Sequence, residues 1–285
     1  KIMYLMAQLP VSLYEVEHKL GACLELAEWR GGSAHLEEAL FAEAGCVTAT
    51  GADETLVAIQ KRLPAKVKFL GYGHRVSFAF VSASVLNGFH LPRVVQRAAA
   101  DMVAWNQLGC LSPHVIYVEQ GGEANGEKFA ELLAAELMER ERMEPRGEVS
   151  TQTAAGIASR RGIYEVRAAH SPETRQWCSE GSTAWTVVFE ADARFQLSCL
   201  NRFVYVKPVA NLEEALHGAD AIREKVSTVG VAVPEHTMGE VATKLARWGA
   251  TRVCPLGRMQ EPPLGWRHDG RPALADLVTW TDLEM

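Results

Sequence analysis

Cys110 is the residue of this sequence best placed to perform covalent chemistry. It follows Gly109 in a short loop, between a stretch of helical periodicity and the apolar run 115–118, so that a flexible backbone can present the thiol to a cleft. A cysteine that only fills a core stands inside an apolar period instead. His114 lies four residues further on, but closeness in sequence does not establish a Cys/His pair. Spacing alone therefore leaves open both a nucleophile and a small core thiol.

The other titratable residues and the composition exclude several classes of function. The six cysteines form no Cys-x-x-Cys pair and no Cys/His cluster at zinc spacing, so we expect reduced thiols and no metal site. With 29 basic against 35 acidic residues and no basic run, nucleic acid is not an expected partner. No stretch is long and apolar enough to be a transmembrane segment, and no leader is visible, which predicts a cytoplasmic protein.

The elements that must position Cys110 alternate between strand and helix patterns. Strands are predicted at 22–28, 46–50 and 115–118, and helices at 35–44, 53–62, 91–105 and 127–144. Strands and helices joined by short loops favour a parallel sheet with crossover helices, which is the usual frame for a nucleotide cofactor. The fold class is therefore α/β. Neither a Gly-x-Gly-x-x-Gly turn nor a P-loop occurs in the sequence.

The loop around Cys110 also carries a family resemblance. Residues 105–113 (WNQLGCLSP) resemble the segment that delivers the nucleophile in aldehyde dehydrogenases, and more closely its counterpart in LuxC-like acyl-CoA reductases. The resemblance implies an aldehyde dehydrogenase-like fold, in which a partial Rossmann-type cofactor lobe is followed by an α/β catalytic lobe. It makes Cys110 the predicted nucleophile, with Asn106 beside it among the candidate catalytic residues.

Two upstream segments resemble the cofactor lobe of the same family. Residues 48–55 (TATGADET) are similar to the strand-turn-helix segment that approaches the cofactor phosphates, which implies cofactor-binding roles for Thr50, Gly51, Ala52, Asp53 and Glu54. Residues 70–78 (LGYGHRVSF) take the place of a segment whose glutamate activates water in aldehyde dehydrogenases. Gly71 falls nearest to that glutamate and is also expected to contact the cofactor.

The missing glutamate favours reduction over oxidation, because a reductase gains nothing from hydrolysing its thioacyl intermediate. In the same segment, His74 is either a polar residue satisfied by the backbone at a strand end or a proton donor that faces Cys110. Both interpretations remain open at this point.

The C-terminal residues 254–266 and 268–272 resemble the closing segment of the reductases. The predicted organisation is therefore the C-terminal part of a cofactor-binding lobe at 1–78, a catalytic lobe at 79–257 and a closing segment at 258–285. Since the chain opens inside the pattern of a cofactor lobe, we expect that an upstream part precedes Lys1.

The resemblance implies reduction of a fatty acyl-CoA to the aldehyde through a thioacyl-cysteine, with NADPH or NADH as the cofactor and an acyl-CoA or acyl-protein as the donor. A homo-oligomer is expected. One alternative is a cysteine acyltransferase or thioesterase that uses Cys110 with His74 or His114 and no nicotinamide. The other is a non-catalytic, truncated paralogue that acts as a binding module.

Overall fold

The computed structural model describes residues 2–272 and 274–284, and it divides into two compact units, Lys1–Gly71 and Tyr72–Met285. Lys1, Ala273 and Met285, which the predicted domains 1–78 and 258–285 include, lie outside the described residues. The division falls between Gly71 and Tyr72, and the lobe boundary at residue 78 stays a prediction. Each unit is described by itself.

The first unit contains a two-stranded sheet of β1 and β2 with four helices. Its core includes Phe41, Leu56, Val67 and Leu70. The predicted strand at 22–28 is wrong, because α2 ends at Ala22 and the residues that follow have no regular structure. The elements are α1 (Ile2–Val16), α2 (His18–Ala22), α3 (Ala34–Glu43), β1 (Cys46–Thr50), α4 (Asp53–Arg62) and β2 (Lys68–Tyr72).

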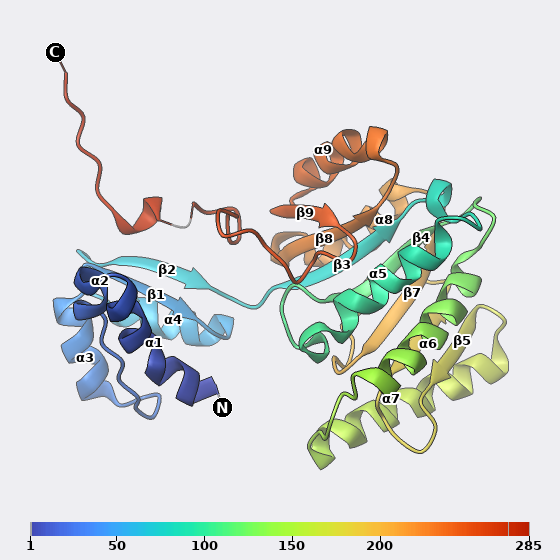
Figure 1. Cartoon of the computed structure of the whole chain (residues 1–285), viewed down its shortest axis with the longest axis horizontal. Coiled ribbons are helices and arrows are strands. Elements are labelled where there is room, and N and C mark those ends of the chain that lie inside the picture. Colours follow the sequence, from blue (N-terminus) through green and yellow to red (C-terminus); the bar gives the residue numbers. More distant parts are fainter. Residues whose placement is uncertain (1, 273, 285) are drawn as a thin grey trace. The chain divides into compact units, whose positions relative to one another are not determined.

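The second unit is built on a seven-stranded sheet in the order β5-β6-β7-β4-β3-β8-β9, in which only the β5–β6 pair is antiparallel (Figure 1). Its strands are β3 (Val76–Val81), β4 (Pro113–Glu119), β5 (Thr174–Cys178), β6 (Thr186–Glu190), β7 (Phe203–Val209), β8 (Val226–Ala232) and β9 (Arg252–Pro255). Its α-helices are α5 (Leu91–Val103), α6 (Gly126–Met143), α7 (Thr151–His170), α8 (Leu212–Gly218) and α9 (Met238–Trp248).

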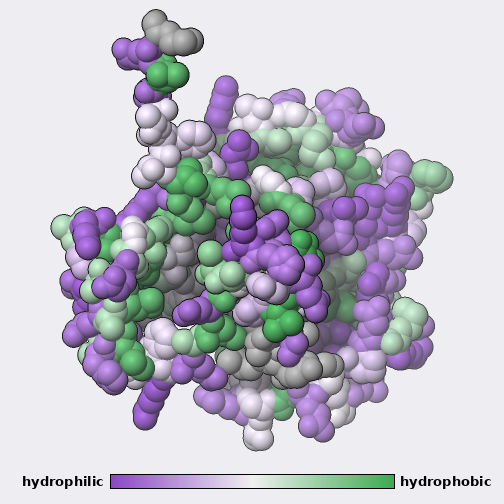
Figure 2. Space-filling model, turned by 60° about the vertical axis from the view of Figure 1, so that its left-hand side comes forward, coloured by the Kyte–Doolittle hydropathy of each residue, from purple (hydrophilic) through white to green (hydrophobic). Residues whose placement is uncertain are grey.

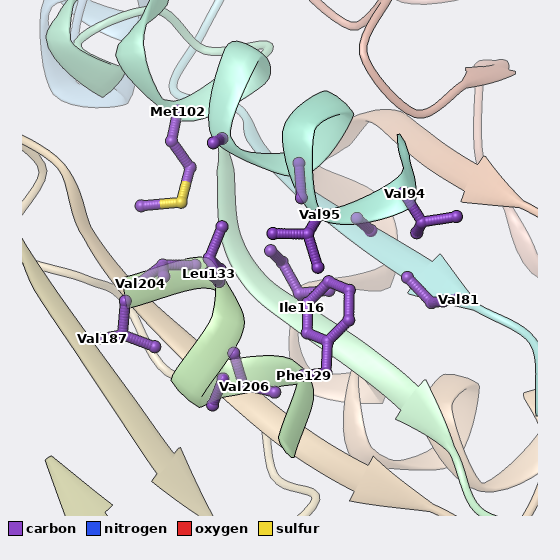
Figure 3. Close-up of a cluster of buried hydrophobic side chains, with 14 of the residues drawn as sticks. Val81, Val94, Val95, Met102, Ile116, Phe129, Leu133, Val187, Val204 and Val206 are labelled. Atoms are coloured by element: carbon purple, nitrogen blue, oxygen red, sulfur yellow. The ribbon is translucent and has the colours of Figure 1, made fainter. Parts of the chain in front are cut away.

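Helices cover both faces of this sheet, which explains why the central strands are apolar without interruption. Alternate residues of β4 enter two clusters: Ile116 packs with α5 and α6 on one face, and Tyr117 packs with α7, α8 and α9 on the other. Figure 3 shows the first cluster, with Val95 and Met102 from α5 and Leu133 from α6 directed at the strands. The predicted α/β class with a parallel sheet is confirmed.

The surface carries both polar and apolar residues. On the face drawn in Figure 2, hydrophobic residues are interspersed among hydrophilic ones. Apolar residues scattered in this way are normal for a folded protein.

Candidate active site

Cys110 is exposed in the loop that joins α5 to β4. The loop lies at the amino ends of the parallel strands, because β4 begins three residues later at Pro113. Ligands of open parallel sheets usually bind at the carboxyl ends of the strands instead. The usual location of ligands in such sheets therefore does not explain where Cys110 lies. The contacts of its loop do.

Three consecutive residues before Cys110 adopt a left-handed backbone. The φ angles of Trp105, Asn106 and Gln107 are 54°, 51° and 63°. For residues with a Cβ this region costs roughly 1 kcal/mol or more per residue, and it persists only where surrounding contacts fix it. The loop is thus held in one conformation by its neighbours.

Gln107 supplies the strongest of these contacts, and its side chain is fully buried. Its Nε2 donates to the carbonyl oxygens of Pro113 at 2.8 Å and Phe203 at 2.7 Å, while its Oε1 accepts from the Phe203 N–H at 2.8 Å. Both ends of the amide are used, so Gln107 ties the Cys110 loop to the start of β7.

Asn106, a predicted catalytic residue, makes structural contacts. Its Nδ2 donates to the Arg146 carbonyl oxygen at 3.1 Å, and its Oδ1 accepts from Arg202 Nε at 3.1 Å. Neither amide atom of Asn106 is directed at Cys110 by a hydrogen bond. We therefore treat Asn106 as a residue that positions the loop.

Ser77 fixes the loop at Cys110 itself. Its hydroxyl, fully buried, donates to the Cys110 carbonyl oxygen at 2.7 Å and accepts from the Thr228 N–H at 3.1 Å. The backbone of the candidate nucleophile is thereby linked to β3 and β8.

The segment after β9 packs against the same loop. Gln260 Nε2 donates to the Ser112 hydroxyl at 2.9 Å, and a Cβ on Gly109 would lie only 3.1 Å from Gln260 Oε1. Asp101 of α5 anchors this segment, because its carboxylate accepts from the Gly257 N–H at 2.5 Å and the Met259 N–H at 2.9 Å. Burial raises the pKa of Asp101 to about 6.

Asp269, further along this segment, is an acidic residue whose charge acts on the Cys110 thiol. Its carboxylate is 4% exposed: Oδ2 accepts from Arg75 Nε at 3.0 Å, and Oδ1 has no hydrogen-bond partner among the described residues. Partial desolvation of the sulfur, followed by the charge of Asp269, raises the pKa of the Cys110 thiol. Within the second unit, these two effects favour the protonated thiol form of Cys110 over the thiolate.

Replacing Asp269 by asparagine is expected to lower the pKa of Cys110, because the negative charge disappears while an oxygen remains for Arg75. Alkylation of Cys110 by iodoacetamide near neutral pH should then accelerate about two- to tenfold, since the thiolate is the reactive form. Mass spectrometry of the Cys110 peptide over a pH series measures this. Asp282→Asn, an exposed position in the C-terminal tail, is the control. An unchanged pH profile in Asp269→Asn would contradict the prediction.

The two candidate histidines differ in their surroundings. His114 is buried, and its Nδ1 accepts from the Ser198 N–H at 3.1 Å and lies 3.0 Å from the Ser198 hydroxyl. Burial, and next the charge of His74, lowers the pKa of His114 to about 4. His114 is thus neutral at pH 7 and a weak base for a thiol. His74 is exposed, so its predicted role as proton donor stays a proposal.

His114 should make the stability of the protein depend on pH. Its folded-state pKa of about 4 lies below the ordinary 6.5, so the unfolded chain binds the extra proton as the pH falls between these values. The contribution of His114 is complete above pH 6.5, and about 2 kcal/mol of it is lost by pH 5. Urea unfolding at pH 7.5 and pH 5 measures this loss. In His114→Gln it should be smaller by that amount, and an equal loss in both proteins would refute the assignment.

The predicted cofactor residues lie in the first unit, at the turn from β1 to α4. Ala52 caps α4 in an extended conformation without a side-chain hydrogen bond, and a Cβ on Gly51 would meet nothing closer than 3.9 Å. Uncapped N–H groups at a helix start can bind a phosphate. Asp53 and Glu54 occupy the first turn, and their carboxylates are no donors to an anion. The backbone N–H groups of the turn therefore suit a phosphate, whereas its two carboxylates oppose the negative charge, and the cofactor-binding role of the turn stays a prediction.

Thr50 and Gly71 lie at the ends of the two strands of the first unit. Thr50 is the last residue of β1, directly before the turn. A Cβ on Gly71 would lie 3.0 Å from the Phe69 ring and 3.4 Å from Leu56. Glycine at position 71 thus allows β2 to pack closely against α4.

Sequence reasoning gave no role to four residues that shape the Cys110 loop. Gln107, Ser77, Gln260 and Asp269 all stand inside the segments that carry the family resemblance. Among their contacts with the loop, the hydrogen bond from Gln260 to Ser112 joins residues 148 positions apart. Only membership of a resembling segment could have pointed to them.

Two further observations concern the part of the chain that the structure describes. It contains no group of three or more His, Cys, Asp or Glu side chains placed to hold a metal ion. None of its helices combines the length and the apolar character that crossing a membrane requires.

Solved structures with a similar fold include aldehyde dehydrogenases. Gamma-glutamyl-gamma-aminobutyraldehyde dehydrogenase from Burkholderia cenocepacia matches with a TM-score of 0.59 and 15% identity, covering 86% of this chain and 53% of that one. A mutant of the indole-3-acetaldehyde dehydrogenase AldA from P. syringae, in complex with NAD+ and IAA, matches with a TM-score of 0.57 and 14% identity, covering 81% and 48%. This chain thus spans about half the length of these proteins, and the likeness shows the fold.

A proline utilization A (PutA) mutant from Bradyrhizobium japonicum gives a TM-score of 0.58 at 15% identity, covering 79% of this chain and 24% of that one. The search of curated proteins found no match. The sequence model described as acyl-CoA reductase (LuxC) matches residues 3–280, which include every segment on which the resemblance was based. The predicted relationship is confirmed, and the chain belongs to the acyl-CoA reductase (LuxC) family.

Proposed function

We propose that this chain carries the nucleophile of an enzyme that reduces a fatty acyl-CoA to the aldehyde with NADPH or NADH. The observation that carries the proposal is the exposed Cys110, held in a fixed loop by Ser77 and Gln107 in a chain of the LuxC family.

In the proposed reaction the Cys110 sulfur attacks the thioester carbonyl and the carbon–sulfur bond to coenzyme A breaks, which leaves a thioacyl enzyme. Cys110 loses a proton when it attacks, and the departing coenzyme A thiolate takes up a proton. His74 is the proposed carrier of this proton between the two sulfur atoms. The backbone N–H of Cys110, close enough to its own sulfur to lower the thiol pKa slightly, is the proposed oxyanion donor.

A bound NADPH or NADH would supply the hydride that reduces the acyl carbon. The turn of Gly51 and Ala52 would hold its phosphates through backbone N–H groups. Cys110 then leaves as the thiolate, which releases the aldehyde, and a proton taken up from water restores the thiol.

The test uses the full-length protein that contains this chain, with a long-chain acyl-CoA and NADPH or NADH. We expect nicotinamide oxidation in step with aldehyde formation, and an acyl adduct on the Cys110 peptide when the nicotinamide is left out. Free fatty acid without nicotinamide oxidation would indicate the thioesterase alternative. No adduct and no turnover would indicate the binding-module alternative.

A further inference from the structure

A cavity of about 860 Å³ lies along β9 and the segment that follows it, at 258–267. This volume is in the range of sites that hold cofactor-sized molecules. Its walls include Arg252, Arg258, Arg267 and Trp266, with Glu261 as the only acidic lining residue among the described part of the chain. The chain as a whole carries a net charge of −6, so three arginines around one cavity are a local excess of positive charge.

The three arginines are not equally engaged. Arg252 donates to the carbonyl oxygens of Met259 at 2.7 Å and Arg258 at 2.9 Å, so it builds the wall of the cavity. Arg258 pairs with Glu261 at 2.7 Å, but both side chains are more than 60% exposed, and such a pair is weak. Arg267 is exposed, and its guanidinium has no ion-pair partner within residues 2–272 and 274–284. Two guanidinium groups are thus available to an anion.

One residue connects this cavity to the nucleophile loop. Gln260 does not itself line the cavity, but it stands between two lining residues, Arg258 and Glu261, and its Nε2 donates to the Ser112 hydroxyl, two residues after Cys110, at 2.9 Å. The segment that forms one wall of the cavity is therefore bonded to the loop that carries the thiol. A substrate with a reactive thioester at one end and several phosphates at the other matches this arrangement.

We infer that this cavity binds the phosphorylated adenosine part of coenzyme A in the acyl donor, with Arg258 and Arg267 on its phosphates. Arginine suits this role because its planar fork can donate two hydrogen bonds to one phosphate. The inference rests on the proposed function for the identity of the donor. Phosphorylated adenosine also occurs in NADPH, so the test must separate the two molecules.

The variants are Arg258→Ala, Arg267→Ala and their combination in the full-length protein. Arg142→Ala is the matched control, because Arg142 pairs with Glu139 at the same i,i+3 spacing and exposure but lies on α6, outside the cavity. Steady-state kinetics compare an acyl-CoA with the same acyl group on N-acetylcysteamine, a thioester without nucleotide. In the double variant the preference for acyl-CoA, as a ratio of kcat/KM values, should fall at least about tenfold through KM. An unchanged ratio would overturn the inference, as would a rise confined to the KM for NADPH.

Calorimetry with free coenzyme A and with pantetheine gives a readout that needs no turnover. Coenzyme A should bind to the unaltered protein and to Arg142→Ala at least about tenfold more tightly than pantetheine, and the double variant should lose this difference. If neither thioester is reduced, the proposed function fails, and this binding difference still decides the inference. Equal binding of coenzyme A and pantetheine to the unaltered protein would refute it.

Discussion

Serine at position 110 is expected to lower acyl-CoA reduction by at least about a thousandfold. The hydroxyl is a far weaker nucleophile than the thiol near neutral pH, and nothing else in the described loop can form a thioacyl bond. The measurement is nicotinamide oxidation with saturating acyl-CoA, together with mass spectrometry for the acyl adduct.

Cys23→Ser is the matched control, because Cys23 is also exposed but lies in the first unit. It should retain both turnover and the adduct on Cys110. Persistent turnover in Cys110→Ser would remove the basis of the proposed mechanism.

Methionine in place of Lys207 is expected to destabilise the protein by about 3 kcal/mol. Lys207 is fully buried, and its Nζ lies 3.2 Å from Oε2 of Glu190, which is 2% exposed. Removing one member of a buried pair leaves the other charge poorly compensated, although Arg167 also pairs with Glu190. Urea unfolding followed by circular dichroism measures the change.

Two comparisons isolate the buried charge as the cause. Lys128→Met breaks an exposed pair with Glu131 and should cost less than about 0.5 kcal/mol. The double variant Lys207→Met with Glu190→Gln should recover part of the stability, because no uncompensated carboxylate remains. Equal losses in Lys207→Met and Lys128→Met would show that the buried pair contributes little.

Local periodicity predicted several elements within a few residues. The predicted helix at 127–144 is α6 (Gly126–Met143), and its cap is readable in sequence, since the Asn125 side chain accepts from the Lys128 N–H. The predicted strand at 115–118 is the centre of β4, whose burial on both faces explains its apolar run. Such elements are determined by residues that are neighbours in the chain.

Elements with weak apolar patterns were missed or misassigned. Helix α7 (Thr151–His170) was not predicted, and only Ile157 and Tyr164 of its twenty residues are buried. The run 22–28 alternates like a strand, yet Leu26 is 48% exposed and no strand forms there. Alternation predicts a strand only where a neighbouring strand offers hydrogen bonds, and that neighbour depends on the tertiary fold.

The sequence by itself determined the family and the α/β class, because both depend on several segments that keep their order along the chain. It also predicted Cys110 as the nucleophile, from the residue type and its place in a loop. Only the tertiary structure decided what surrounds the thiol. Ser77 and Gln107 meet because parallel strands place their amino ends along the same edge of the sheet. Gln260 and Asp269 follow the carboxyl end of β9 instead, and the hydrogen bonds of Asp101 and Ser112 hold their segment against the loop. The raised pKa of the Cys110 thiol and the cavity along β9 both arise from contacts between residues far apart in the sequence. No local sequence pattern predicts such contacts.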